Sequence, residues 1–120
     1  MSKQVVSVAA LAMGLSFASS AMGAIRITEW MYSDQEFIEI TNTGAAAIDL
    51  AGWSFDDSTR TPGSFAIGSL GILAAGESAI ISESAAADFR TAWGLSAAVK
   101  IIGGNANNLG RSDEINIYDS

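Results

Sequence analysis

Two adjacent aspartates, Asp56 and Asp57, lie in the stretch DLAGWSFDDS at residues 49–58 and are the first candidates for chemistry. A hard cation such as Ca²⁺ needs roughly six oxygen ligands. The segment DDSTR supplies few of them and places Arg60 in the same loop. Short side chains of this kind accept hydrogen bonds from backbone N–H groups in turns. We therefore expect a turn and no metal site, and the alternative is a calcium site completed by Asp49 or by a distant loop.

Glu36 and Glu39 form a second pair of carboxylates, in the stretch EFIEITN. Successive side chains of a strand point to opposite faces of a sheet, so residues three apart do not face each other. The two glutamates therefore cannot form the carboxylate pair that glycosidases use. We interpret both as solvated charges at a sheet edge or as cross-strand partners.

Nucleophilic catalysis is not expected, because the chain lacks the residues that commonly support it. It has no histidine, the commonest general base near neutral pH, and no cysteine. Ser64, Ser78 and Ser82 therefore have no histidine to activate them, and no Ser-x-x-Lys motif replaces it. The loop GGNANNLG at 103–110 lacks the lysine and the strand-to-helix transition of a phosphate-binding loop. We predict a protein that is not an enzyme, with no catalytic residue, no cofactor and no bound metal.

The composition predicts one packed domain with an acidic surface. Of the 120 residues, 49% are hydrophobic and 16% are charged, as in a globular protein. Six basic residues stand against 13 acidic ones, which gives a net charge of −7. A polyanion would be repelled by such a chain, so nucleic acid is not an expected partner.

Residues 1–23 have the pattern of a secretory signal peptide. Lys3 precedes an apolar run over 5–18, and small residues follow, with Ala21 and Gly23 at the −3 and −1 positions of a cleavage site. The run is shorter than the ~20 apolar residues that span a bilayer. We expect export through the secretory pathway to the periplasm, the cell surface or the medium. The mature domain, residues 24–120, would keep five basic and 13 acidic residues, a net charge of −8.

Apolar residues recur with a period of two after residue 24, as half-buried strands require. The runs at 24–30 and 36–42 flank a short polar link, which predicts an antiparallel hairpin. Five further strand candidates are separated by glycine-rich turns, and about seven short strands indicate a sandwich or a barrel. These five candidates lie at 48–56, 64–70, 78–84, 97–102 and 113–119.

One short helix interrupts the strands. Ser84 is suited to cap the segment AAADFRTAW, and Phe89 and Trp93 lie four apart on one helical face. Gly94 is suited to the left-handed position after the last turn. We expect this helix to form a lid on the sandwich, with its aromatic pair in core contact.

Four segments of the chain resemble the lamin-tail domain, most closely its bacterial secreted members. They are FIEITN at 37–42, DLAGW at 49–53, LAAGE at 73–77 and DEINIYD at 113–119, with Phe65 between the second and the third. Their order and approximate spacing match those of the family over nearly the whole mature chain. The resemblance implies an immunoglobulin-like antiparallel β-sandwich that serves as a binding or anchoring module and has no catalytic residues of its own.

Trp53 is the largest apolar side chain near the middle of the predicted fold. We expect it on a strand, buried between two sheets, with Gly52 leaving room for the indole or for a bulge. Its replacement by alanine would then cost ~3–5 kcal/mol. The other predicted core residues are Ile38, Ile40, Leu50, Gly52, Ile81 and Ile117.

Two functions are compatible with the sequence. The first is a non-enzymatic interaction or anchoring module that binds an unknown protein or envelope component through its loops or an exposed strand edge. The second is a carbohydrate-binding module, which would present exposed, coplanar aromatic rings to sugars. Trp30, Tyr32 and Trp93 are the candidates for such rings. Exposure of both Trp30 and Tyr32 would favour the carbohydrate hypothesis, and burial would exclude it.

The segment 113–119 is the last predicted strand. In the lamin-tail pattern a glycine turn and one more strand follow this place, and the sequence does not have them. We therefore expect a domain that lacks its last strand and self-associates through the open edge. The alternative is that Asp113, Glu114 and Asp119 protect a short edge by charge repulsion.

Overall fold

The computed structural model describes residues 24–120, so the predicted signal peptide lies outside the described residues. This part of the chain contains one α-helix, and none of its helices has the length and apolar character needed to cross a bilayer. Its elements are β1 (Ile25–Met31), β2 (Phe37–Asn42), β3 (Ile48–Asp49), β4 (Ser54–Asp56), β5 (Phe65–Ala66), the 3-10 helix η1 (Gly68–Leu70), β6 (Ile72–Leu73), β7 (Ser78–Ser82), α2 (Ala86–Trp93), β8 (Lys100–Ile102) and β9 (Asn116–Tyr118).

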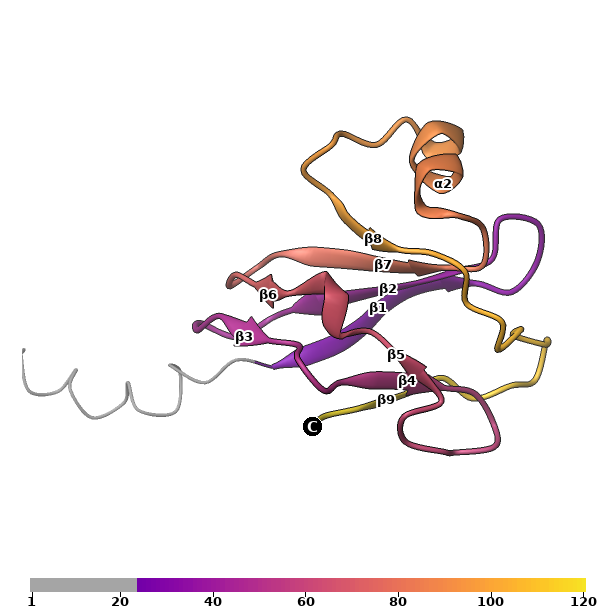
Figure 1. The fold of residues 1–120 in the computed structure, drawn as a ribbon, viewed down its shortest axis with the longest axis horizontal. Coiled ribbons are helices and arrows are strands. Elements are labelled where there is room, and N and C mark those ends of the chain that lie inside the picture. The colour runs from indigo at the N-terminus through magenta and orange to yellow at the C-terminus, as the bar shows by residue number, and fades with distance from the viewer. Residues whose placement is uncertain (1–23) are drawn as a thin grey trace, which may run out of the picture.

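One layer of the fold is a four-stranded sheet with the order β1-β2-β7-β8 (Figure 1). The predicted hairpin is confirmed, because β1 and β2 pair antiparallel with Ile27 opposite Ile40. The register shifts between Ile27 and Glu29, which places a bulge in the edge strand β1. Bulges of this kind interrupt the backbone ladder at the edge of a sheet.

The second layer consists of the pair β3-β6 and the three-stranded sheet β5-β4-β9. The single strand predicted over 48–56 is divided into β3 and β4 by a turn, in which Trp53 donates its N–H to the carbonyl of Leu50 at 2.9 Å. Gly52 occupies this turn with φ 83°, a conformation that glycine adopts without strain. The expected core role of Gly52 is therefore wrong, because the residue is exposed and serves the turn.

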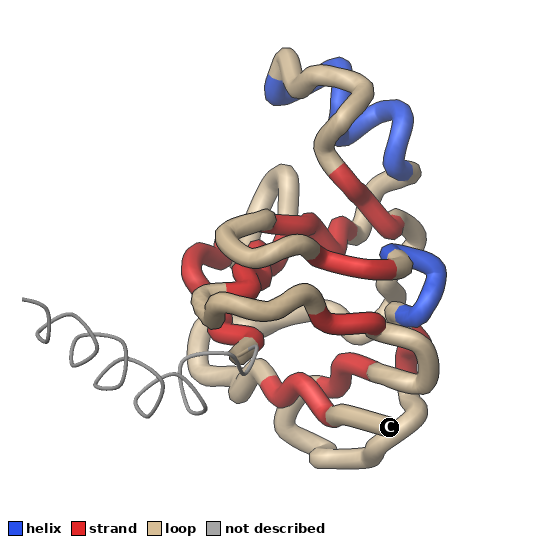
Figure 2. The backbone as a smooth tube through the Cα atoms, turned by 90° about the vertical axis from the view of Figure 1, so that its left-hand side faces the viewer, coloured by secondary structure: helices blue, strands red, loops and turns tan. Residues whose placement is uncertain are grey.

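The connection from β7 to β8 departs from the expected all-antiparallel sandwich. These two strands are parallel, with Ile80 opposite Ile101. A parallel pair needs a crossover connection, and α2 lies within it. The helix stands over the outer face of the four-stranded sheet, the face that points away from the second layer (Figures 1 and 2). The predicted lid is thus also the link that makes the parallel pairing possible.

Both ends of α2 are defined by close backbone contacts. Gly94 ends the helix in the left-handed conformation, as predicted. Ser84 does not cap the other end, because the N-cap is Ala85 and no side chain bonds there. The carbonyl of Ser84 instead accepts the N–H of Gly104 at 3.2 Å. A Cβ at Gly103 would lie 2.5 Å from that carbonyl oxygen, so only glycine allows this approach of the chain after β8.

The main core lies between the two layers. Ile38, Ile40, Leu50 and Ile81 are fully buried in it. Trp53 and Ile117 are only partly buried and pack against its margin. Within residues 24–120, the largest fully buried side chain of this core is that of Phe55, on β4. The expectation that Trp53 is the central aromatic is therefore wrong, because Trp53 is the last residue of the turn at Gly52 and β4 begins one residue after it.

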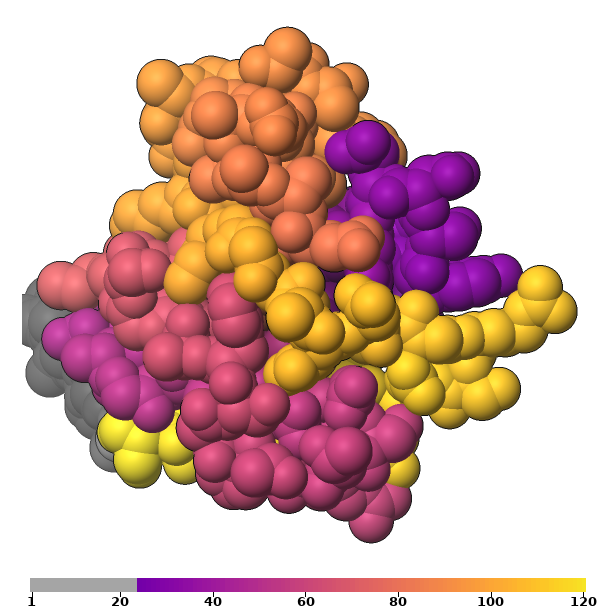
Figure 3. Space-filling model, turned by 45° about the vertical axis from the view of Figure 1, so that its right-hand side comes forward, coloured from indigo at the N-terminus to yellow at the C-terminus, as the bar shows by residue number. Residues whose placement is uncertain are grey.

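A second, smaller cluster lies on the outer face of the four-stranded sheet, under α2. It consists of Phe37, Ile80 and Phe89, with Leu95 and Val99 packed against it. The Phe37 and Phe89 rings meet edge to face with centroids 5.4 Å apart. The space-filling view shows α2 and its flanking loops as a cap on the sandwich (Figure 3).

The burial of the aromatic side chains predicts the order in which their replacement by alanine lowers the free energy of unfolding. Phe55→Ala removes a fully buried ring and is expected to lower the free energy of unfolding by ~3–5 kcal/mol. Trp53→Ala is expected to cost less, about 1–2 kcal/mol, because the indole is only partly buried. Trp30→Ala, at a side chain that is 58% exposed, is the control and should change stability by no more than ~0.5 kcal/mol. Urea melts would test this order, and a larger loss for Trp53→Ala than for Phe55→Ala would contradict it.

Candidate interaction surfaces

The three aromatic residues predicted to face a ligand are all exposed. Trp30 is 58% exposed, Tyr32 42% and Trp93 44%. They do not form one platform, because Trp30 lies opposite Ile38, on the core side of the sheet, at its edge. Trp93 lies on the outer side, where its ring stacks on Phe89 with centroids 5.8 Å apart. The exposure of both Trp30 and Tyr32 favours sugar binding, but Trp30 and Trp93 lie on opposite faces of the sheet.

A hollow with a volume of about 580 Å³ lies between β1 and β9. We call it the β1–β9 groove. Each of these strands is the last strand of its own sheet, so each has a free edge among the described residues. Free edges present unpaired backbone N–H and C=O groups to an incoming strand. The lining residues are Ile25, Arg26, Ile27, Trp53, Ile115, Asn116, Ile117, Tyr118 and Asp119.

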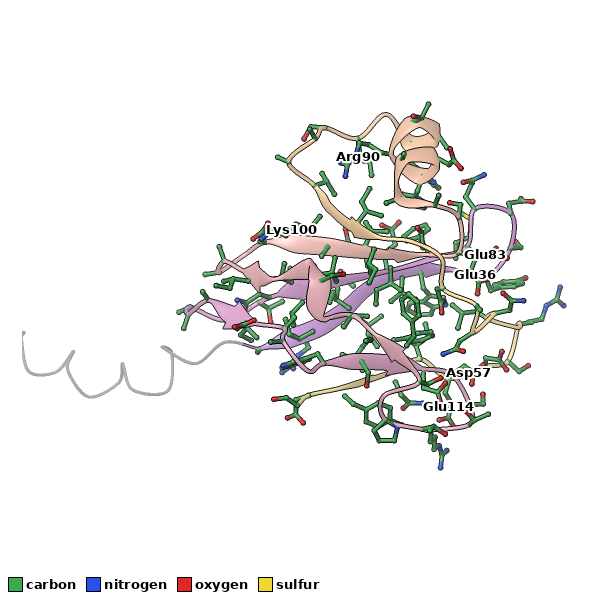
Figure 4. All side chains as sticks on the ribbon, viewed as in Figure 1. Glu36, Asp57, Glu83, Arg90, Lys100 and Glu114 are labelled. Atoms are coloured by element: carbon green, nitrogen blue, oxygen red, sulfur yellow. The ribbon has the colours of Figure 1, made fainter. Side chains whose placement is uncertain are left out.

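The acidic residues around β9 differ in whether their carboxylates form hydrogen bonds or ion pairs within the molecule. Asp113 accepts the N–H of Gly110 at 2.5 Å. Glu114 forms an ion pair with Arg60, and the guanidinium lowers the pKa of this carboxyl to about 2. Figure 4 shows Glu114 close to Asp57 at this end of the molecule. Asp119 is exposed and lines the β1–β9 groove, so it is the acidic side chain that stands at the free edge itself.

Asp56 holds the loops around β4 together. Its carboxylate accepts the hydroxyl of Thr59 at 2.5 Å, the N–H of Thr61 at 2.6 Å and the side-chain amide of Asn107 at 3.2 Å. The Thr59 hydroxyl and the Thr61 N–H lower the pKa of Asp56 to about 2. Asp57 accepts the N–H of Thr59 at 3.1 Å. The two aspartates are therefore turn residues, and Asp56 is in addition a buried link to the 103–110 loop.

The structure shows how the other polar side chains of residues 24–120 are arranged. No three acidic, histidine or cysteine side chains of this region lie close enough together to hold a metal ion. The hydroxyl of Ser64 belongs to the same network as Asp56, since it accepts the side-chain amide N–H of Asn107 at 2.9 Å. Ser78 bonds with the Thr41 hydroxyl at 2.7 Å, and Ser82 donates to the carbonyl of Ser84 at 2.8 Å.

Glu36 is buried, contrary to the interpretation that it is a solvated charge. It accepts the N–H of Leu109, which ties the start of β2 to the loop before β9. Burial raises the pKa of Glu36, the Leu109 N–H opposes this, and the charges of Glu83 and Asp113 raise it further. Figure 4 shows Glu36 beside Glu83, and Figure 3 shows the β1–β2 loop next to the loop that precedes β9.

Asn42 is a structural residue that the sequence pattern did not single out. Its amide donates to the carbonyls of Ala46 and Leu73 at 2.8 and 3.0 Å, and its oxygen accepts the N–H groups of Ala24 and Gly44 at 3.2 and 3.1 Å. The side chain thereby joins the first residue before β1 to the β3-β6 pair. The position of Asn42 at the end of an apolar strand and before a Thr-Gly turn is the sequence feature that could have indicated this structural role.

The network of Asp56 predicts a pH-dependent stability. Its pKa is about 2 in the folded protein and 3.8 without the fold, so its contribution is present above pH 3.8 and is lost as the pH falls toward 2. Asp56→Asn should be less stable than the parent protein at neutral pH, and the difference should shrink as the pH falls through this window. Urea melts at several pH values would test it, with Asp57→Asn as the neighbouring control. A difference that does not change with pH would contradict the prediction.

Comparison with known proteins places this architecture in a family. Residues 18–120 match the family model of the Lamin Tail Domain. Neither the search of curated proteins nor the search of solved structures gave a significant match. The match covers well over half of the chain and agrees with the mainly β, two-layer structure described above, which is the immunoglobulin-like fold of this family. The chain therefore belongs to the lamin-tail domain family.

Proposed function

We propose that this protein is an exported interaction or anchoring module that binds a protein partner of the cell envelope or the cell surface. The family membership supports a module of the immunoglobulin-like type. The signal-peptide pattern of residues 1–23 and the resemblance to bacterial secreted members support export. The partner would be met outside the cytoplasm.

The β1–β9 groove is the observation that carries the binding proposal. An extended segment of a partner that enters it meets the free edges of two sheets, whose backbone groups provide hydrogen bonds for strand addition. The partly buried side chains of Ile27, Ile115 and Ile117 line the same groove and offer apolar contacts. Backbone pairing would give affinity, and the apolar contacts would select the partner's alternate side chains.

A non-enzymatic role is supported by how the polar residues are used. The chain has no histidine or cysteine, and Asp56 and Glu36 are engaged in holding loops. Carbohydrate binding has less support, since Trp30 and Trp93 lie on opposite faces of the sheet. We therefore do not propose a sugar as the ligand.

Export has a direct test. We expect the protein from a producing bacterium to begin at Ala24, because Ala21 and Gly23 are small residues at the −3 and −1 positions. Ala21→Gln places a larger polar side chain at the −3 position and should leave the precursor uncleaved. Ser20→Gln is the matched control and should be cleaved normally. Intact-mass measurement distinguishes these results, and an uncleaved parent protein in the cytoplasm would contradict export.

The binding proposal is tested with a photoreactive phenylalanine analogue introduced at single positions in the producing cell. At Asp119, which is exposed at the β1–β9 groove, we expect one discrete crosslinked product with a partner protein. At Asp88, an exposed residue of α2, we expect none. A product that contains a second copy of the chain would identify edge-strand self-association in place of a separate partner. Equal products from both positions, or none from Asp119, would contradict the proposal.

A further inference from the structure

A second groove lies on the outer face of the four-stranded sheet, beneath α2 and the loop 94–99. It consists of two hollows of about 440 and 120 Å³. Both are lined by Glu39 on β2, Ile80 on β7 and Leu95 after the helix, so they form one continuous surface, the outer-face groove. The main core lies on the other side of this sheet, and none of these three residues lines the β1–β9 groove. The two surfaces are therefore separate.

The outer-face groove has an excess of negative charge. Glu29 and Glu39 are direct cross-strand neighbours and both line it. Like charges in this position repel each other and destabilise a sheet. Glu39 accepts the Thr28 hydroxyl at 2.6 Å, and within residues 24–120 neither glutamate forms an ion pair with a basic side chain. The charge of this pair is therefore not compensated within the described part of the chain.

A third carboxylate extends this charge along the groove. Glu77 lines the larger hollow, and Lys100 partly neutralises it in an ion pair of 3.1 Å. No lysine or arginine lines either hollow. A basic group that approached the sheet between Glu29 and Glu39 would meet two carboxylates and no cation, with the apolar Ile80 beside them.

The remaining walls are apolar. Ile80, Leu95 and Val99 line the larger hollow, and Trp93 lines the smaller one with a ring that is 44% exposed. An aromatic face attracts a nearby cation, and apolar walls bind methylene groups and apolar side chains. The groove thus combines the two properties that a long basic side chain with apolar neighbours requires.

We infer that the outer-face groove binds a short segment of a partner protein in which lysine or arginine is flanked by apolar residues. The basic group would lie between Glu29 and Glu39, and its apolar neighbours would contact Ile80 and Leu95. The larger hollow falls within the size range of ordinary ligand pockets and has room for a few side chains. A second copy of the chain is a poor occupant, because residues 24–120 have a net charge of −8 and two copies repel each other.

The pair of glutamates first allows a test without any ligand. Glu39→Gln keeps the oxygen that accepts the Thr28 hydroxyl and removes the repulsion from Glu29. The melting temperature of this variant should rise above that of the parent protein at neutral pH. An unchanged or lower melting temperature at neutral pH would show that the pair is not repulsive and would overturn the inference.

Binding is then tested by calorimetry with the purified protein and a short peptide of alternating leucine and lysine. The matched peptide has glutamate in place of lysine. We expect only the lysine peptide to bind, and Glu39→Gln to raise its dissociation constant about tenfold, since a lost charged hydrogen bond has an effect of this order. About 0.5 M salt should weaken binding as well, because it screens exposed charges. Asp57→Asn removes a carboxylate at the other layer and should bind as the parent does.

Two tryptophan substitutions, one inside the outer-face groove and one beside it, test where the lysine peptide binds. Ala98 is exposed and lines the larger hollow, whereas its neighbour Ala97 is exposed and lies away from it. Ala98→Trp should fill the groove and abolish binding of the lysine peptide, and Ala97→Trp should leave the dissociation constant unchanged. Equal binding by both variants, equal binding of the glutamate peptide, or no binding of the lysine peptide to the parent would overturn the inference. None of these results bears on the β1–β9 groove, which is tested by crosslinking at Asp119.

Discussion

The packing of the two β-layers over one apolar core is the constraint on which the rest of the structure depends. Ile38 and Ile40 from β2 and Ile81 from β7 meet Phe55 of β4 in this core, and all four are fully buried. Because strand side chains alternate, this choice of inner residues places Phe37, Glu39 and Ile80 on the outer face. The apolar members of that face must be covered by something else. The helix α2 provides the cover with Phe89, and the part of the face that it leaves open is the outer-face groove.

The parallel pairing of β8 explains why a helix is found in a sandwich of this size. A strand that follows β7 in the same direction must be reached by a crossover, and the crossover needs more residues than a tight turn offers. The residues of this crossover form α2, and two glycines allow the helix to pack in this position. Gly94 takes the left-handed conformation that ends the helix, and Gly103 allows the backbone after β8 to pass close to the helix start. The crossover from β7 to β8 therefore accounts both for the parallel pairing of these strands and for the shape of the surface around α2.

Much of the architecture was predictable because apolar alternation reports directly on burial. It located β1, β2 and β7 and selected the isoleucines that form the core. The errors arose where a tertiary contact decides the role of a residue. Trp53 is the last residue of a turn whose exact position depends on Gly52, and Ser84 lies where the chain after β8 approaches the helix. Glu36 is buried by a loop more than 70 positions along the sequence, at Leu109. The two-residue strands β3, β5 and β6 have too few residues to show a period. The grooves were not predictable for the same reason, since each is formed by segments distant in sequence.

The polar residues divide into those that hold the fold and those that remain for recognition. Asp56, Asn42 and Glu36 each bind backbone N–H or C=O groups of distant segments, so their chemistry is used within the molecule. Buried polar groups with satisfied hydrogen bonds fix one arrangement of loops, and they are not free to act on a substrate. Two sets of groups that do not hold the fold in this way are the backbone at the β1 and β9 edges and the carboxylates of Glu29 and Glu39, which form no ion pair within residues 24–120. The first suits an extended chain and the second a basic side chain, and both are groups that a protein partner provides. A domain arranged in this way is suited to recognition, because both sets of groups can be reached from the surface.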